Sequence, residues 1–330
     1  MRNLTTIFCF LFISFSAIAQ QDAHYTQFMY NKLLLNPAFS GARQVNSISA
    51  LYRTQWIGFD GHPQSYLLSY DGIVAKEALG YGIVLHSQTD GIINQKIANI
   101  SLSYNILHVT DETTLRIGLS GALRQYTFDL QNPNIYIKDR LDPSLQQSDA
   151  KLVNANVGAG IYFDNKEYYI GVSIPNLMKN PVFVNANTAA SNISGVETPH
   201  IYVMAGGFFK LFNNDDLHLK PSLMFKQADD SPYSLDLNVS VAFQKTFTAG
   251  VSYRTGGKYK GDPLSGSDSF DLLAFLQANS QLGVGVAYDF TLSQLAQYSQ
   301  GSIEAVLRYD FVPSGLSSQK KVMHNPRYFF

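Results

Sequence analysis

The chain has 330 residues, of which 45% are apolar and only 15% are charged, against about 25% charged residues in an average soluble domain. Its 24 basic and 25 acidic residues give a formal net charge of −1, which excludes a strongly basic nucleic-acid-binding surface, so we expect no nucleic-acid partner. No apolar run after residue 20 approaches the roughly 20 residues of a membrane-spanning helix, so the chain is either an unusually uncharged soluble β protein or a membrane β-barrel.

The first predicted element is a secretory signal peptide at residues 1–19. Arg2 precedes an apolar stretch that closes on an A-x-A cleavage site at residues 17–19. We expect the mature chain to begin at Gln20 and to be exported. Because the only cysteine, Cys9, lies in this signal, the mature chain would have no disulfide, no thiolate nucleophile and no cysteine zinc ligand.

Residues 20–44 carry the only helical pattern of the mature chain. Apolar residues recur there at i, i+3, i+4 and i+8, at Tyr25, Phe28, Met29 and Leu33. The pattern ends at Pro37, because the residue before a proline disfavours helix. We predict a short amphipathic helix that forms a plug or a periplasmic lid, and we expect this segment and the C-terminal tail, residues 313–330, to face the periplasm.

Residues 45–312 are dominated by a period of two, with apolar residues on one side and small or polar residues on the other. The stretch LGVGVAYDF at 282–290 is typical, since its apolar positions alternate with two glycines, an alanine and Asp289. Breaks at Gly, Pro, Asn and Asp divide the region into 14 predicted strands. These are 45–58, 64–73, 79–88, 96–108, 113–128, 150–163, 168–175, 200–212, 217–227, 233–244, 247–256, 269–276, 281–290 and 301–312.

The connections between these strands alternate in length, although those at 59–63 and 228–232 are about as short as some of the tight turns. Long connections follow odd-numbered strands, at 129–149, 176–199, 257–268 and 291–300. Tight turns follow even-numbered strands, at 109–112, 164–167, 213–216 and around Lys245. Outer-membrane barrels have this topology, with short turns in the periplasm and long loops outside. We therefore predict an all-β, transmembrane, antiparallel up-and-down β-barrel of about 14 strands over residues 45–312, with a periplasmic β-sandwich or propeller as the alternative.

Aromatic and charged residues have distinct places in this predicted barrel. Aromatic residues gather near strand ends, as interfacial girdles would, at Tyr52, Trp56, Tyr66, Tyr126, Phe128, Tyr162, Tyr168, Phe270, Tyr288, Phe290, Tyr309 and Phe311. The candidates to line the lumen are the charged residues on the polar side, Asp289, Glu304, Arg308 and Asp310. These charges could set the ion selectivity of a pore, or they could pair with one another across strands.

The sequence shows no enzymatic constellation. Its seven histidines lack H-x-H and H-E-x-x-H spacings, and no G-x-S-x-G elbow occurs. We therefore predict a non-enzymatic protein with no cofactor and no metal site. An outer-membrane hydrolase assembled from distant Ser, His and Asp residues is the weakest alternative.

Short motifs follow one another along the whole mature chain. They are QFMYN at 27–31, LNPA at 35–38, RTQWIG at 53–58, SYD at 69–71, SIPNL at 173–177, KPS at 220–222, GVSYR at 250–254, GS at 301–302 and NPRY at 325–328. As an ordered set they resemble the PorP/SprF family of the Bacteroidetes type IX secretion system.

The resemblance implies an outer-membrane component of the secretion and gliding machinery that helps to export or attach large surface proteins, such as adhesins with C-terminal sorting domains. The implied partners are this cargo, the lipoprotein ring components of the machine and the lipid bilayer, and no catalysis is implied. Motif positions then become candidate partner contacts: Tyr25, Phe28, Asn36, Pro37, Arg53, Trp56, Asn325, Pro326, Arg327 and Tyr328. A general porin or hydrophobic-solute channel is the alternative, because 14 strands enclose more space than wall side chains fill.

Overall fold

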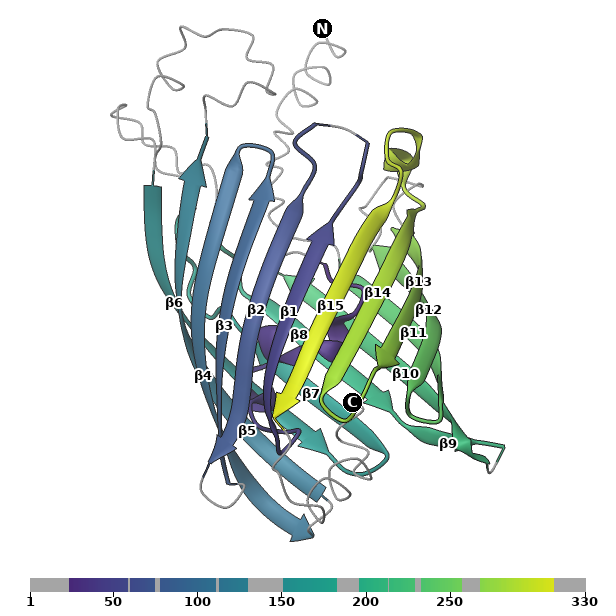
Figure 1. Cartoon of the computed structure of the whole chain (residues 1–330). Coiled ribbons are helices and arrows are strands. Elements are labelled where there is room, and N and C mark those ends of the chain that lie inside the picture. The colour runs from purple at the N-terminus through teal and green to yellow at the C-terminus, as the bar shows by residue number, and fades with distance from the viewer. Residues whose placement is uncertain are drawn as a thin grey trace, which may run out of the picture.

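A computed structural model describes residues 24–58, 60–74, 78–110, 113–129, 151–182, 196–212, 214–228, 233–256 and 268–311. They form one antiparallel sheet that closes on itself where β1 pairs with β15 (Figure 1). The strands are β1 Asn46–Thr54, β2 Gln64–Val74, β3 Leu79–Asp90, β4 Ile93–Thr110, β5 Thr113–Phe128, β6 Lys151–Asp164, β7 Tyr168–Ile174, β8 His200–Gly207, β9 Phe209–Leu211, β10 Asn214–Ala228, β11 Ser234–Phe243, β12 Phe247–Gly256, β13 Ser269–Gln277, β14 Leu282–Thr291 and β15 Ser302–Phe311.

The barrel has 14 strand positions, which confirms the predicted topology. Strands β8 and β9 are separated by one residue and both pair with β10, so they occupy one position in the wall. We call the end at which β1 begins and β15 ends the lower end, and the opposite end the upper end (Figure 1). The predicted long connections join strands at the upper end, which in a barrel of this topology faces the outside of the cell.

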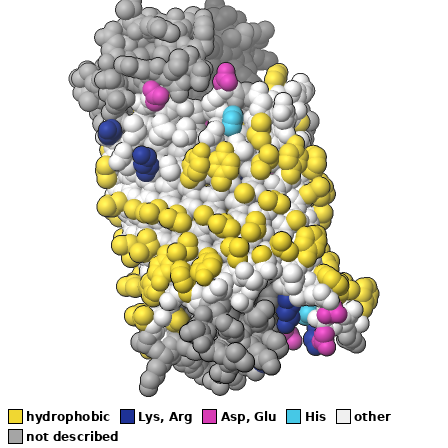
Figure 2. Space-filling model, in the orientation of Figure 1, with side chains coloured by type: hydrophobic (Ala, Val, Ile, Leu, Met, Phe, Trp, Pro, Cys, Tyr) yellow, Lys and Arg dark blue, Asp and Glu magenta, His cyan; other side chains and the backbone are white. Residues whose placement is uncertain are grey.

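The period-two pattern separates an outer from an inner face, as predicted. On β14 the side chains of Val284 and Val286 are 38% and 53% exposed, whereas Ala287 and Asp289 are buried. On the face in view in Figure 2, apolar side chains cover the middle of the wall and charged ones lie towards its margins. Among the described residues no helix is long and apolar enough to cross a membrane.

The predicted aromatic girdle is right for outward-facing residues such as Tyr66, which is 53% exposed, and wrong for three others. Tyr126, Phe128 and Tyr162 are at most 5% exposed and point into the barrel. On β5 the even-numbered side chains point inward and the odd-numbered ones outward. Tyr126 and Phe128 therefore lie on the same inner face as the buried Arg124.

Residues 24–45, which we call the plug, lie inside the barrel instead of facing the periplasm (Figure 1). The predicted amphipathic helix is also wrong, because the plug folds into three short 3-10 turns: η2 Phe28–Tyr30, η3 Lys32–Leu34 and η4 Pro37–Phe39. A fourth turn, η5 Gln294–Gln297, lies between β14 and β15. Gln27 and Lys32 are as fully buried as Phe28. This part of the plug therefore has no water-exposed side, which an amphipathic helix requires.

Candidate functional site: the plugged lumen

The upper end of the plug is held by a buried ionic cluster, the Arg53 cluster, formed by Thr26, Arg53, Asp289 and Glu304. Arg53 on β1 forms ion pairs with Asp289 on β14, at 2.6 Å, and with Glu304 on β15, at 3.0 Å. These three side chains are at most 3% exposed. Arg53 and Glu304 are direct partners across the β1–β15 seam, so the cluster lies where the barrel closes.

Glu304 also binds the plug backbone directly. Its two carboxylate oxygens accept hydrogen bonds from the backbone N–H groups of Thr26, at 2.9 Å, and Gln27, at 2.8 Å. The Thr26 hydroxyl donates to Asp289 at 2.8 Å and accepts from Arg53 at 3.1 Å. Buried charges are tolerated when they are paired and hydrogen-bonded in this way. The cluster therefore joins the plug and three strands into one polar network.

The lower end of the plug has a second network on the same seam, the Arg43 cluster. Plug residue Arg43 pairs with Asp71 on β2 at 2.9 Å and with Asp310 on β15 at 3.5 Å. Asp310 also pairs with Arg308 at 3.0 Å and accepts a hydrogen bond from Ser47 at 2.5 Å. The plug is thus fixed to the wall at both ends of the β1–β15 seam, by hydrogen bonds to buried charges at the upper end and by ion pairs of Arg43 at the lower end.

The middle of the plug is held by close packing instead of charge. Inward-facing glycines let its backbone touch the wall: an added Cβ would lie 2.2 Å from the Ala38 nitrogen at Gly118, and 2.0 Å from the Ser40 oxygen at Gly80. Only glycine permits such a close backbone approach. Gly118 and Gly80 therefore mark two places where the plug backbone lies directly against the wall.

Side-chain hydrogen bonds join the plug to the wall around these contacts. The Asn36 side chain accepts from the Ala38 nitrogen at 2.9 Å, capping η4, and donates to the Ile161 oxygen of β6 at 3.0 Å. Ser173 on β7 donates to the Leu35 oxygen at 2.6 Å, and Ser103 on β4 donates to the Ser40 oxygen at 2.6 Å. The plug backbone is thus paired with the wall strands that surround it.

Lys32 is a buried plug cation held by aromatic rings. Its ammonium lies 4.1 Å from the Tyr169 ring centre and 5.1 Å from that of Phe39, and it has no hydrogen-bond partner among the described residues. Nearby, the Tyr30 ring stacks on Phe275 with a centroid distance of 4.1 Å. Cation–π attraction strengthens when water is excluded, so the Tyr169 and Phe39 rings stabilise the Lys32 ammonium, which forms no ion pair with a carboxylate of the described residues.

Against β5 and β6, part of the connection between β7 and β8 folds inward around Glu197. Its carboxylate pairs with Arg124 at 3.1 Å and accepts from Tyr126 at 2.7 Å and from Asn156 at 3.0 Å. Arg124 also donates to Asn176. A small space of about 50 Å³ remains between this region and the plug, lined by residues that include Tyr25 and Arg124. Plug and connection therefore both fill the upper part of the lumen.

The predicted lumen-lining residues all lie on the inner face, in two separate clusters. Asp289 and Glu304 belong to the Arg53 cluster, whereas Arg308 and Asp310 belong to the Arg43 cluster. Asp289, Glu304, Arg308 and Asp310 are at most 2% exposed. They pair with other charges in the wall and plug, and their side chains are buried instead of lining open water.

The predicted partner contacts within the described residues are largely buried. Tyr25, whose hydroxyl lies 2.7 Å from His86 Nε2, and Phe28 are plug residues that face the wall. Asn36 caps η4, Pro37 is its first residue, and Arg53 lies in the Arg53 cluster. Trp56 is half-buried above the seam with a left-handed φ of 50°. The remaining candidates, Asn325, Pro326, Arg327 and Tyr328, lie outside the described residues, so contact with partners stays a prediction.

Sequence reasoning missed Thr26, Arg43, Asp71 and Glu197 as members of these networks. A signal existed for Asp71, because it shares the inward phase of Ser65, Leu67 and Ser69 on β2. The plug residues and Glu197 lie outside regular strands, where alternation assigns no face. No group of three or more His, Cys, Asp or Glu side chains in the described residues is placed to hold a metal ion.

Comparisons of fold find other outer-membrane barrels at low sequence identity. Omp33 of Acinetobacter baumannii is 5% identical, with 81% of this chain and 99% of that chain covered and a TM-score of 0.46. A FadL homologue of Pseudomonas aeruginosa is 12% identical, with 89% and 95% covered and a TM-score of 0.45. The KdgM porin is 12% identical, with 80% and 99% covered and a TM-score of 0.36. No functional statement follows from similarities at this level.

Sequence comparison is more specific. No curated relative matches the chain. A family profile described as "Type IX secretion system membrane protein PorP/SprF" matches residues 17–309, which include the plug and nearly the whole barrel. The chain therefore belongs to the PorP/SprF family of type IX secretion system membrane proteins, and it has the fold of an outer-membrane β-barrel.

Proposed function

We propose that this barrel is a non-enzymatic subunit of the type IX secretion and gliding machinery that takes part in exporting, or attaching at the cell surface, large proteins with C-terminal sorting domains. Membership in the PorP/SprF family supports a role in this machinery. The observation that favours attachment over passage through its own lumen is the plug, which is hydrogen-bonded to Glu304 at the upper end of the β1–β15 seam and ion-paired through Arg43 at the lower end.

In this proposal the two ends of the barrel serve different partners. The upper end, with its longer connections, meets the sorting-domain cargo. The lower end meets the lipoprotein ring components in the periplasm, through the tail that follows β15 and carries Asn325, Pro326, Arg327 and Tyr328. Support for this division comes from the strand topology, since short turns of outer-membrane barrels face the periplasm.

Surface display tests the cargo role. Cells that lack the protein should lose display of one cognate sorting-domain protein, and the full chain should restore it. A chain that lacks residues 314–330 but reaches the outer membrane in normal amount should fail to restore display. Normal display without the protein would contradict the proposal as a whole. Normal display with the shortened chain would contradict only the role of the tail.

A general porin or hydrophobic-solute channel is the second candidate, favoured by the width of a 14-strand barrel. Conductance in planar bilayers separates the two. The plugged subunit should give no large steady conductance, and Arg53→Ala, which removes the cation that joins Asp289 to Glu304, should raise it. A large steady conductance from the unaltered protein would favour the porin.

A further inference from the structure

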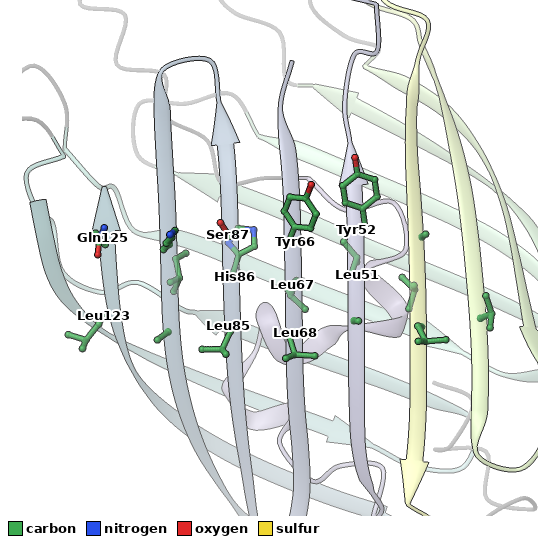
Figure 3. Close-up of a pocket in the computed structure, with 18 of the residues that line it drawn as sticks. Leu51, Tyr52, Tyr66, Leu67, Leu68, Leu85, His86, Ser87, Leu123 and Gln125 are labelled. Carbon is green, nitrogen blue, oxygen red and sulfur yellow. The ribbon is translucent and has the colours of Figure 1, made fainter. Parts of the chain in front are cut away.

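The outer wall contains an apolar concavity of about 880 Å³ across β15, β1, β2, β3, β4 and β5 (Figure 3). No plug residue lines it, so it belongs to the bilayer side of the barrel. The lining side chains on the outer face form two rows that follow the strand register. The lower row is apolar, with Leu307, Ala50, Leu68, Leu85, Ala98 and Leu123 directly opposite one another on successive strands.

Alanines make this row uneven. Leu68, Leu85 and Leu123 are 48%, 49% and 59% exposed and project outward, whereas Ala50 and Ala98 lie between such leucines in the same row. The short side chains leave space between the long ones. Hydrocarbon fills such a space readily, because the lining is apolar and water gains no hydrogen bonds there.

The row above is polar and aromatic. Tyr52, Tyr66, Ser87, Lys96 and Gln125 follow one another across five strands in register, and Figure 3 shows the labelled tyrosines, Ser87 and Gln125 above the labelled leucines. Tyrosines on the outer face of a barrel mark the membrane–water interface. Lys96 therefore lies at the boundary between hydrocarbon and water.

The next row of outer-face residues towards the upper end supports this boundary. On β2 to β6 it consists of polar or charged residues, Gln64, Thr89, Asn94, Thr127 and Lys151, and on β15 the same row ends in Ile303. The outer face thus changes from apolar to polar within two rows, with Lys96 at the change. A lysine at this depth is favourable only where its ammonium reaches polar groups at the interface.

We propose that the concavity binds a phosphate-bearing lipid of the outer leaflet, with the phosphate at Lys96 and an acyl chain over Ala50 and Ala98. Charge supports this occupant, because Lys96 is the only basic residue apart from His86 among those that line the concavity, and none of them is acidic. Ser87 and Gln125 are its direct cross-strand neighbours, about 4.8 Å away on either side. They add hydrogen-bond donors beside the ammonium, as a phosphate with several acceptor oxygens requires.

This site is independent of the secretion role, so either can fail alone. The test is native mass spectrometry of the full-length barrel in detergent, titrated with phosphatidylglycerol and, for comparison, with phosphatidylcholine. The unaltered protein should retain phosphatidylglycerol preferentially. Lys96→Gln should lower this retention about fivefold. The matched control is Lys151→Gln, which removes an outward lysine that does not line the concavity and should leave retention unchanged.

A second variant tests the shape of the site. Ala98→Leu fills the concavity without changing charge, so it should lower the retention of both lipids. Equal losses for Lys96→Gln and Lys151→Gln, no preference for phosphatidylglycerol, or unchanged retention in Ala98→Leu would each overturn the proposal. So would a photo-crosslinker at position 98 that captures a protein, and no lipid, in intact outer membranes.

Discussion

The two ends of the plug and its middle are held by different physical means. At the ends, buried carboxylates and guanidinium groups join the plug to the β1–β15 seam. In the middle, backbone meets backbone at inward glycines. An ionic anchor depends on a full set of partners, because removing one leaves a buried charge uncompensated. A packed contact depends only on the absence of side-chain atoms, so the two kinds of contact should respond to different substitutions.

The largest effect should come from the Arg53 cluster. Arg53→Ala leaves Asp289 and Glu304 buried, close together and without their guanidinium, which should cost about 3–5 kcal/mol of unfolding free energy. Urea unfolding from lipid vesicles measures this loss, and protease cleavage near Thr26 should increase in parallel. A loss no larger than that of an exposed ion pair would show that the cluster does not anchor the plug.

Packing in the middle of the plug should give the next largest effect. Gly118→Ala places a Cβ 2.2 Å from the Ala38 nitrogen, and backbone cannot move aside cheaply, so we expect a loss of about 1–3 kcal/mol. The control is Gly121→Ala on the same strand, where an added Cβ meets nothing within 4 Å. Equal unfolding midpoints for the two variants would contradict the close approach of plug and wall.

Asn36 separates capping of η4 from attachment to the wall. Asn36→Ala removes the acceptor for the Ala38 nitrogen and the donor to the Ile161 oxygen, which should cost about 1–2 kcal/mol. Asn36→Ser keeps a capping oxygen but not the donor to β6. Its unfolding free energy should lie between those of the alanine variant and the unaltered protein; a value equal to that of the alanine variant would assign the whole effect to the wall.

The smallest effect should come from an exposed ion pair, Lys210–Asp215, which serves as a comparison for these buried anchors. Lys210 and Asp215 lie 2.5 Å apart, with side chains 60% and 83% exposed. Water and salt screen such a pair, so Lys210→Ala should change the unfolding free energy by about 0–1 kcal/mol. A larger loss would mean that charge pairing stabilises this barrel without burial, and the contrast with Arg53 would fail.

Strand number, approximate strand positions and the direction of the faces could be predicted because they depend on alternation and turn residues alone. Single strand ends were wrong by three or four residues: β1 ends at Thr54 instead of residue 58, β4 begins at Ile93 instead of residue 96, and β10 begins at Asn214 within the predicted turn 213–216. The stretch LGVGVAYDF shows this: Gly283, Gly285, Ala287 and Asp289 face inward on β14, and Val284 and Val286 face outward. Gly285 shows what alternation cannot supply. An added Cβ there would lie 2.3 Å from the Gln27 side chain, a contact between residues that are far apart in the sequence.

The candidate site was less predictable than the barrel. Helical spacing in the plug identified apolar residues that are buried, but the pattern assumes that the other side faces water. Inside a closed barrel that assumption fails, and Gln27 and Lys32 are buried too. Glu197 is a similar case, since nothing in its neighbourhood in the sequence indicates Arg124, Tyr126 and Asn156 as its partners.

The position of the plug along the β1–β15 seam has a consequence for assembly. The plug begins near the upper ends of β14 and β15, where Thr26 binds Glu304, and ends at the lower end, where Asn46 begins β1. A barrel that closed first would leave this segment no lengthwise path past the close contacts at Gly118 and Gly80. We therefore expect the first and last strands to pair around a segment that is already in place, with the seam as the last part of the wall to form.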